Sequence, residues 1–415
     1  MQKIEKVKLK NGLEINFLFD KKFTTSSIQM CFKIGWRNDT ESERGLAHLF
    51  EHLVGKRTKK YSGKSEFAKK LDQEGIVSNA WTGPDMTVYY QNQTNRQLLT
   101  SLDLFYEAIY NTEFVGEDLE KEKEIVLNEA KRYLDNDGSV LWRQTIKNLY
   151  PGTTMEKFFF GDRETMKNIT LKHFEDFYRI YRNPKNSILF IGTNDIKSKK
   201  KVLDFLNKFY ANVDNKKLFS NQKISTYKDV PGKIIKYSLI EKPHKELSSI
   251  LLYYRTRNTS PRENIVGSVI VSMLVGGLTS KMMQILRDEM GLVYGIGIDG
   301  GDYLQGIHYG GFQTSCDKDK KDLVIKSIKE ILINFTKTVT QEDINLIIPK
   351  REYAIEKPIF VGSDIESLID CVFYKNKYIQ REEYLKILKS VNVKEVKKLL
   401  KEMFDEEKST ICVLE

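Results

Sequence analysis

Apolar and polar residues alternate along the first part of the chain, as they do in strands that bury one face. Residues 4–20 read as two such strands around Asn11 and Gly12, a dipeptide that favours a tight hairpin turn. A further run covers residues 26–35, and residues 77–94 read as another strand pair. These patterns predict a mainly antiparallel sheet in the first half of the chain.

Between and after these strands, the apolar residues recur at three- and four-residue spacing, which predicts amphipathic helices. Such helices are predicted for residues 43–56, 62–75, 96–111 and 117–136. Because strands and helices are mixed without strict alternation, an α+β fold with sheets covered by helices is favoured over a doubly wound fold.

The order of these patterns restarts in the second half. Residues 233–257 resemble residues 4–35 in order and character, and helical patterns follow in both halves. We therefore predict two similar α/β domains related by internal duplication, each a mainly antiparallel sheet covered by helices. The first would span residues 1–215 and the second residues 233–415, joined by a polar linker at 216–232.

The composition is that of an ordinary folded protein, with 40% hydrophobic and 30% charged residues. No apolar run reaches the ~18 residues of a membrane helix, and the charged, alternating N-terminus does not resemble a secretory signal. The four cysteines lie far apart and form no CxxC pair. We therefore expect reduced thiols in a cytoplasmic protein without a membrane span.

The formal net charge of +10 raises the alternative of a basic protein that binds nucleic acid. The basic residues are interleaved with acidic ones, however, and no aromatic stacking motif accompanies them. We expect no nucleic-acid partner, and a salt-dependent shift with DNA or RNA would support the alternative.

Two of the five histidines, His48 and His52, lie four residues apart with Glu51 between them. Positions i, i+3 and i+4 share one face of a helix, so both imidazoles can reach a single ion. This is the H-x-x-E-H arrangement of zinc peptidases, in which the acid works on the metal-bound water. The alternative is a helix with two ordinary histidines.

Zinc needs a third protein ligand and an open position for water. The predicted helix at 117–136 offers Glu129, and Glu122 lies two turns earlier on the same face, where a supporting carboxylate would be useful. On their residue types alone, both acids also fit solvated positions of a helix rich in lysine and glutamate.

Four segments together resemble the pitrilysin/insulinase family of zinc metallopeptidases, in the short-chain branch that includes the mitochondrial processing peptidase. They lie in the family's order, at residues 45–67, 79–91, 122–132 and 276–297. The resemblance implies a zinc metalloendopeptidase, with the zinc-binding catalytic site in the first domain and a homologous domain without zinc in the second.

By this resemblance, His48, His52 and Glu129 hold one Zn²⁺ per chain. Glu51 is the general base that takes a proton from water and passes it to the leaving amine. Glu122 is implied as the supporting acid next to the metal ligands.

The resemblance also implies the residues that bind the substrate. Asn79 and Ala80 match a strand that pairs with an extended peptide backbone. Arg287 and Tyr294 match a pair in the second domain that holds the substrate carbonyl from the opposite side and stabilises the oxyanion.

Short members of the family form half of a chamber, so the resemblance implies a homodimer that cuts peptides or unfolded segments, such as bacterial peptide precursors. Two alternatives stay open at this point. The chain could pair with a degenerate partner in a heterodimer, or it could be a non-catalytic subunit of a processing peptidase.

Overall fold

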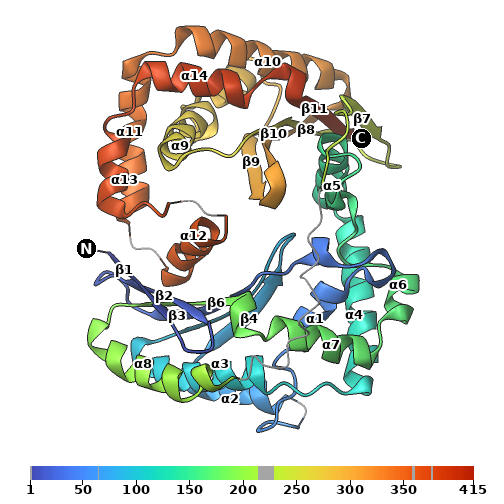
Figure 1. The fold of residues 1–415 in the computed structure, drawn as a ribbon. Coiled ribbons are helices and arrows are strands. Elements are labelled where there is room, and N and C mark those ends of the chain that lie inside the picture. Colours follow the sequence, from blue (N-terminus) through green and yellow to red (C-terminus); the bar gives the residue numbers. More distant parts are fainter. Residues whose placement is uncertain (1, 64, 214–228, 358–359, 375–376) are drawn as a thin grey trace. The chain divides into compact units, whose positions relative to one another are not determined.

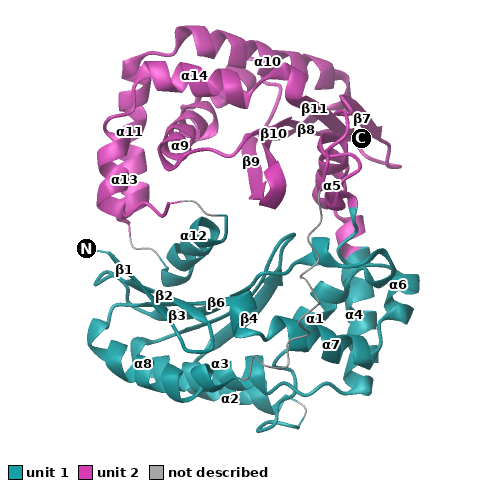
Figure 2. Cartoon of the chain, viewed as in Figure 1, with its two compact units in different colours: residues 1–131, 157–227, 358–375 teal, residues 132–156, 228–357, 376–415 magenta. Residues whose placement is uncertain are grey.

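The computed structural model describes residues 2–63, 65–213, 229–357, 360–374 and 377–415. Most of the predicted linker, residues 216–232, lies outside these ranges. The chain divides into two compact units, coloured separately in Figure 2. Unit 1 contains residues 1–131, 157–227 and 358–375, and unit 2 contains the remaining segments.

Unit 1 is built on a six-stranded sheet in the order β1-β2-β6-β3-β5-β4. All neighbouring strands run antiparallel except β2 and β6, which run parallel. The central strands β3 and β6 are buried along their whole length, so their residues are apolar or hydrogen-bonded on both faces. The strands are β1 (Lys3–Lys8), β2 (Glu14–Phe19), β3 (Ser26–Phe32), β4 (Val77–Thr82), β5 (Thr87–Gln93) and β6 (Ser187–Thr193).

Helices cover both faces of this sheet (Figure 1). The helix α3 packs against β3 and β5, whereas α12 packs against β3 and β6. The helices of unit 1 are α1 (Leu46–Leu53), α2 (Glu66–Glu74), α3 (Leu98–Tyr110), α4 (Gly116–Asp135), α6 (Arg163–Asn168), α7 (Leu171–Tyr181), α8 (Lys199–Lys208) and α12 (Val361–Phe373).

Unit 2 contains a five-stranded sheet in the order β7-β11-β8-β10-β9. Only β7 and β11 run parallel. The strands are β7 (Tyr237–Ile240), β8 (Leu247–Arg255), β9 (Ile296–Tyr303), β10 (Ile307–Asp317) and β11 (Ser409–Leu414).

The helices of unit 2 enclose a large apolar core that includes Leu252, Val269 and Phe312. α5 packs against β8 and β11, and α10 packs against β8 and β10. The helices are α5 (Asp137–Leu149), α9 (Pro261–Val275), a π-helical turn (Met283–Glu289), α10 (Lys321–Thr338), α11 (Gln341–Glu356), α13 (Arg381–Leu388) and α14 (Val393–Met403).

The two sheets share one topology. If β2 to β6 are matched in chain order with β7 to β11, the two strand orders are identical, and the single parallel pair falls at the same place in each. The predicted fold class of two similar, mainly antiparallel domains is therefore confirmed. In this match, β4 and β9 are the corresponding edge strands.

The compact units are not continuous in sequence. Residues 132–156, which contain α5, belong to unit 2, and residues 358–375, which contain α12, belong to unit 1. Each unit therefore combines segments that are separated in sequence, whereas the domains predicted at 1–215 and 233–415 are continuous. The exchange follows from packing, because the apolar faces of α5 and α12 are buried on strands far away in sequence.

The sequence predicts no membrane span and four reduced cysteines. Within the described ranges, no helix has both the length and the apolar character needed to cross a bilayer. All four cysteines are free thiols, three of them buried.

Candidate metal centre

The helix α1 presents His48, Glu51 and His52 from one face. Its opposite face is anchored by Phe50, which is 2% exposed and packs among the aromatic rings of α7. The helix is shorter than the predicted 43–56, because glycines with left-handed φ values of +93° and +78° lie at Gly45 and Gly55.

The first turn of α1 is held by a buried carboxylate. Oδ2 of Asp39 accepts a hydrogen bond from the Gly45 N–H at 3.0 Å, and Oδ1 accepts one from the Ala47 N–H at 3.1 Å. These two amides would otherwise lack partners at the helix start. Asp39 therefore fixes the position of the helix that carries both histidines.

Three side chains of unit 1 converge on one point. The Nε2 atoms of His48 and His52 lie 3.2 Å apart, and Oε2 of Glu129 lies 3.7 Å from the first and 3.5 Å from the second. Ligands at zinc distances around a tetrahedral ion are about 3.3 Å apart. The three residues therefore fit a zinc ion with one coordination position left for water or substrate.

Burial keeps His48 in the form that binds a metal. It is 6% exposed, and desolvation, together with the neighbouring His52, lowers the pKa of His48 to about 3. The imidazole is therefore neutral at physiological pH and offers a lone pair rather than a proton.

Glu122 supports the second histidine. Its Oε2 lies 3.1 Å from Nδ1 of His52, and its Oε1 is paired with the ammonium group of Lys56. In the tautomer with a proton on Nδ1, His52 donates a hydrogen bond to this carboxylate, which leaves the Nε2 lone pair facing the cluster. Lys56 was not among the predicted site residues, because only the fold brings it to Glu122.

Glu51 lies beside this cluster. Its carboxylate accepts a hydrogen bond from Oγ1 of Thr82 at 2.6 Å. Burial raises the pKa of Glu51, and the nearby charge of Glu129 adds to this effect. A carboxylate with a raised pKa is suited to take up a proton. Thr82 was not among the predicted site residues. It is the last residue of β4, and only the fold brings this strand end to Glu51.

The predicted substrate strand is the free edge of the sheet. Among the described residues β4 pairs only with β5, and Val77 at its start is 65% exposed. The Ala80 N–H donates to Oδ1 of the adjacent Asn79 at 2.9 Å rather than to another strand. The backbone of β4 can therefore accept an additional strand once the Asn79 side chain turns aside.

Arg287 and Tyr294 lie together on unit 2. The Arg287 guanidinium carbon is 5.3 Å from the centre of the Tyr294 ring, a cation–π contact. Tyr294 is 87% exposed, so its hydroxyl is open to solvent. The structure thus brings the two predicted residues together, on a unit separate from the one that carries the histidines.

The chain is similar in sequence to proteins named as zinc proteases. The chain is 24% identical over 401 residues to an "Uncharacterized zinc protease" of Rickettsia felis, covering 94% of this chain and 92% of that protein. It is 30% identical over 217 residues to "Zinc protease PqqE" of Helicobacter pylori, covering 52% of this chain and 48% of that protein.

The fold has counterparts among solved structures. The crystal structure of a protease from Helicobacter pylori covers 100% of both chains with a TM-score of 0.85 and 22% sequence identity. Structural similarity at 22% sequence identity supports a shared fold and no more.

Two family models match the chain in sequence order. The model for the insulinase family, Peptidase family M16, matches residues 18–162, which include His48, Glu51, His52 and Glu129. The model for the Peptidase M16 inactive domain matches residues 168–349. These two matches span most of the chain, which therefore belongs to the insulinase family, peptidase family M16.

Proposed function

We propose that this chain is a zinc-dependent endopeptidase that hydrolyses peptides or unfolded segments. The observation that carries the proposal is the convergence of His48, His52 and Glu129, whose ligand atoms all lie within 4.8 Å of one another. The partly buried Glu51 next to them supplies the general base. The zinc protease names of the relatives support the same conclusion.

Each residue has a separate task in the proposed reaction. A Zn²⁺ held by the three ligands would supply a water of lowered pKa and polarise the substrate carbonyl. Glu51 takes a proton from the attacking water and later passes it to the leaving amine. Thr82 holds the Glu51 carboxylate in place through its hydrogen bond.

The substrate would bind as an additional strand on β4. Backbone hydrogen bonds to Asn79 and Ala80 would align the peptide without reading its sequence. This mode requires an extended segment, because a folded protein has no free strand to offer. Peptides and unfolded regions are therefore the proposed substrate class.

We also propose that the functional unit is a homodimer. In this arrangement Arg287 and Tyr294 of one chain would stabilise the oxyanion that forms at the metal centre of the other. The chain carries both halves of such a site, so a second copy suffices. The alternative is a heterodimer with a partner chain that lacks an intact zinc motif. The mass of the purified protein in solution tests this, because the homodimer has twice the mass of the single chain.

The decisive test replaces the general base. Glu51→Gln preserves shape but removes the proton acceptor, so we expect zinc binding to persist while hydrolysis of a mixed peptide library falls at least a hundredfold. Zinc content by atomic absorption and cleavage by mass spectrometry check the two parts. Glu124→Gln, at an exposed position of α4, is the matched control and should behave like the wild type.

The same measurements distinguish a peptidase from a non-catalytic subunit. A non-catalytic subunit would show no hydrolysis in the wild type under any metal condition. Cleavage by Glu51→Gln at the wild-type rate would contradict the proposed mechanism.

A further inference from the structure

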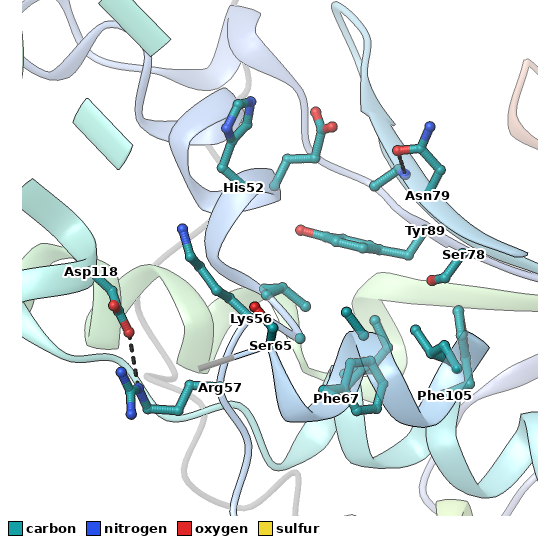
Figure 3. A pocket seen from close by; sticks show the side chains of 18 of the residues that line it. His52, Lys56, Arg57, Ser65, Phe67, Ser78, Asn79, Tyr89, Phe105 and Asp118 are labelled. Atoms are coloured by element: carbon teal, nitrogen blue, oxygen red, sulfur yellow. Dashed lines mark hydrogen bonds and ion pairs between the residues drawn. The ribbon is translucent and has the colours of Figure 1, made fainter. Parts of the chain in front are cut away.

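The edge strand β4 and the metal helix α1 border one pocket of about 920 Å³ within unit 1. Figure 3 shows His52 of α1 and Asn79 of β4 on opposite sides of this pocket. A peptide paired with β4 would reach the metal ligands only if the strand is held at the correct distance from the helix. Because a displacement of about 1 Å can lower a rate by about 100-fold, this distance matters for the proposed reaction.

One short stretch of the chain, residues 35–39, contacts both elements, and we call it the bridge segment. It contains a single turn of 3-10 helix, Trp36–Asn38. At its end, the Asp39 carboxylate accepts hydrogen bonds from two backbone amides at the start of α1. At its beginning, the segment bonds to residues 83–86, the loop between β4 and β5. The bridge segment therefore connects the metal helix to the substrate strand.

Backbone contacts join the bridge segment closely to this loop. The Trp36 N–H donates to the Gly83 carbonyl oxygen at 3.1 Å. The Arg37 N–H donates to the Pro84 carbonyl oxygen, also at 3.1 Å. A Cβ atom added to Gly35 would lie only 2.3 Å from the Gly83 oxygen and 2.4 Å from the Pro84 oxygen. The backbone of Gly35 is extended, with φ −137° and ψ −174°, so it is the close approach of the loop that requires glycine here.

A buried ion pair adds a side-chain contact between the same two segments. Nη1 of Arg37 lies 2.8 Å from Oδ1 of Asp85 in the loop, and both side chains are fully buried. Burying two charges carries a large desolvation cost, so such a pair adds little net stability, whereas it can favour one geometry over others. This contact is therefore suited to holding the loop in one position.

The bridge segment is itself held in place, so it can transmit a position. The Lys157 ammonium group donates to the carbonyl oxygens of Asp39 at 2.6 Å and of Arg37 at 3.3 Å. At the other end of the connection, Thr82 immediately precedes the loop and donates to the Glu51 carboxylate. A displacement of the loop would therefore change the spacing between β4 and the residues of α1.

We propose that Gly35, Arg37 and Asp85 are positioning residues that set the distance between the substrate strand and the metal helix. They act through the bridge segment and the β4–β5 loop, and they supply neither a metal ligand nor the general base. This inference rests on the proposed peptidase function and names residues that the same site needs for its geometry.

The first test changes the spacing without changing any charge. Gly35→Ala places a methyl group against the loop, which must move by about 1 Å to restore ordinary van der Waals contact. With the zinc-loaded full chain and a fluorogenic peptide, we expect kcat to fall by about tenfold or more. KM and the Kd for zinc should change by less than about twofold, because the strand edge and the metal ligands are intact.

Gly116→Ala at the start of α4 is the matched control. An added Cβ atom there meets no atom of the described residues within 4 Å, so this variant should keep the wild-type kcat. A wild-type kcat for Gly35→Ala as well would contradict the role of Gly35.

The second test uses conservative rescue of the ion pair. Arg37→Lys shortens the base and Asp85→Glu lengthens the acid by one methylene group, so each single variant should lower kcat. The double variant restores the combined reach of the pair and should recover most of the loss. A general loss of stability would accumulate in the double variant instead, and the absence of recovery would contradict a positioning role for the pair.

Binding gives a readout that does not need hydrolysis. A peptide hydroxamate would pair with β4 and chelate zinc at the same time, so its affinity depends on the spacing of the two sites. Gly35→Ala should raise its Kd by about tenfold or more. The Kd of acetohydroxamate, which binds only the metal, and that of the plain peptide, which binds only the strand, should stay unchanged.

The outcomes separate the inference from the proposed function. Loss of peptide hydroxamate affinity in Gly35→Ala, without any hydrolysis by the wild type, would reject the peptidase function but keep the spacing role. The same Kd and the same kcat in Gly35→Ala and the wild type would overturn the inference. A peptide hydroxamate that binds the wild type no better than acetohydroxamate would overturn both the inference and the proposed binding of peptides to β4.

Discussion

At the scale of single residues, the site depends on a chain of contacts behind the metal ligands. Lys56 holds Glu122, and Glu122 in turn holds Nδ1 of His52. Because Glu122 is 4% exposed, solvent cannot easily replace it as the acceptor for the imidazole proton. Supporting carboxylates of this kind raise the basicity of the ligand and fix its orientation.

Replacing this support should weaken metal binding without removing a ligand. Glu122→Gln replaces one carboxylate oxygen by an NH₂ group, which donates hydrogen bonds, so either His52 or Lys56 loses its acceptor atom. We expect the Kd for zinc to rise by about 10- to 100-fold. Competition with a chromophoric chelator measures this value. An unchanged affinity would show that Glu122 is not needed to orient His52.

At the scale of secondary-structure elements, several helices begin where a side chain accepts a hydrogen bond from one of the first backbone amides. The start of α9 is an example in unit 2. Oγ of Ser260 accepts from the Glu263 N–H, and Oε2 of Glu263 accepts from the Ser260 N–H at 2.8 Å. Arg257 pairs with the same carboxylate at 2.6 Å. These contacts lower the pKa of Glu263 to about 2.

The lowered pKa of Glu263 predicts a dependence of stability on pH. A carboxyl whose folded pKa lies below its unfolded value stabilises the protein above about pH 4.5, and this contribution is lost as the pH falls towards 2. Allowing for solvent screening of this partly exposed pair, we expect Glu263→Gln to cost about 1 kcal/mol near neutral pH. Urea unfolding of the metal-free protein checks this. A difference from wild type that grows as the pH falls would contradict it.

At the scale of the whole molecule, the metal ligands lie on unit 1 and the predicted oxyanion pair on unit 2. If each site combines unit 1 of one chain with unit 2 of another, two inactive variants should complement each other. A dimer of one Glu51→Gln chain and one Tyr294→Phe chain would contain one complete site and one site with both defects.

Mixing the two variants therefore tests the composite site. Each variant alone should be nearly inactive, and a randomly exchanged mixture should recover about a quarter of wild-type activity, since half the dimers carry one intact site out of two. Peptide hydrolysis after co-expression with different affinity tags measures the recovery. A mixture as inactive as its components would show that Arg287 and Tyr294 do not act across chains.

The sequence by itself determined the local elements and the repetition of the fold. The hairpin at Asn11-Gly12 and the helix that carries His48 and His52 are confirmed, because turn chemistry and apolar periodicity act over a few residues. The predicted helix at 117–136 offered Glu129 as a candidate, and the resemblance to the family implied it as a ligand. In the structure Oε2 of Glu129 lies 3.7 Å from Nε2 of His48 and 3.5 Å from Nε2 of His52.

Only the tertiary structure decided what depends on contacts between distant segments. It exchanged α5 and α12 between the units, because each helix buries its apolar face on strands far away in sequence. It brought Thr82 to Glu51 and Lys56 to Glu122. No spacing along the chain predicts these pairs, since a polar residue on a strand or loop acquires its role from whatever the fold packs against it.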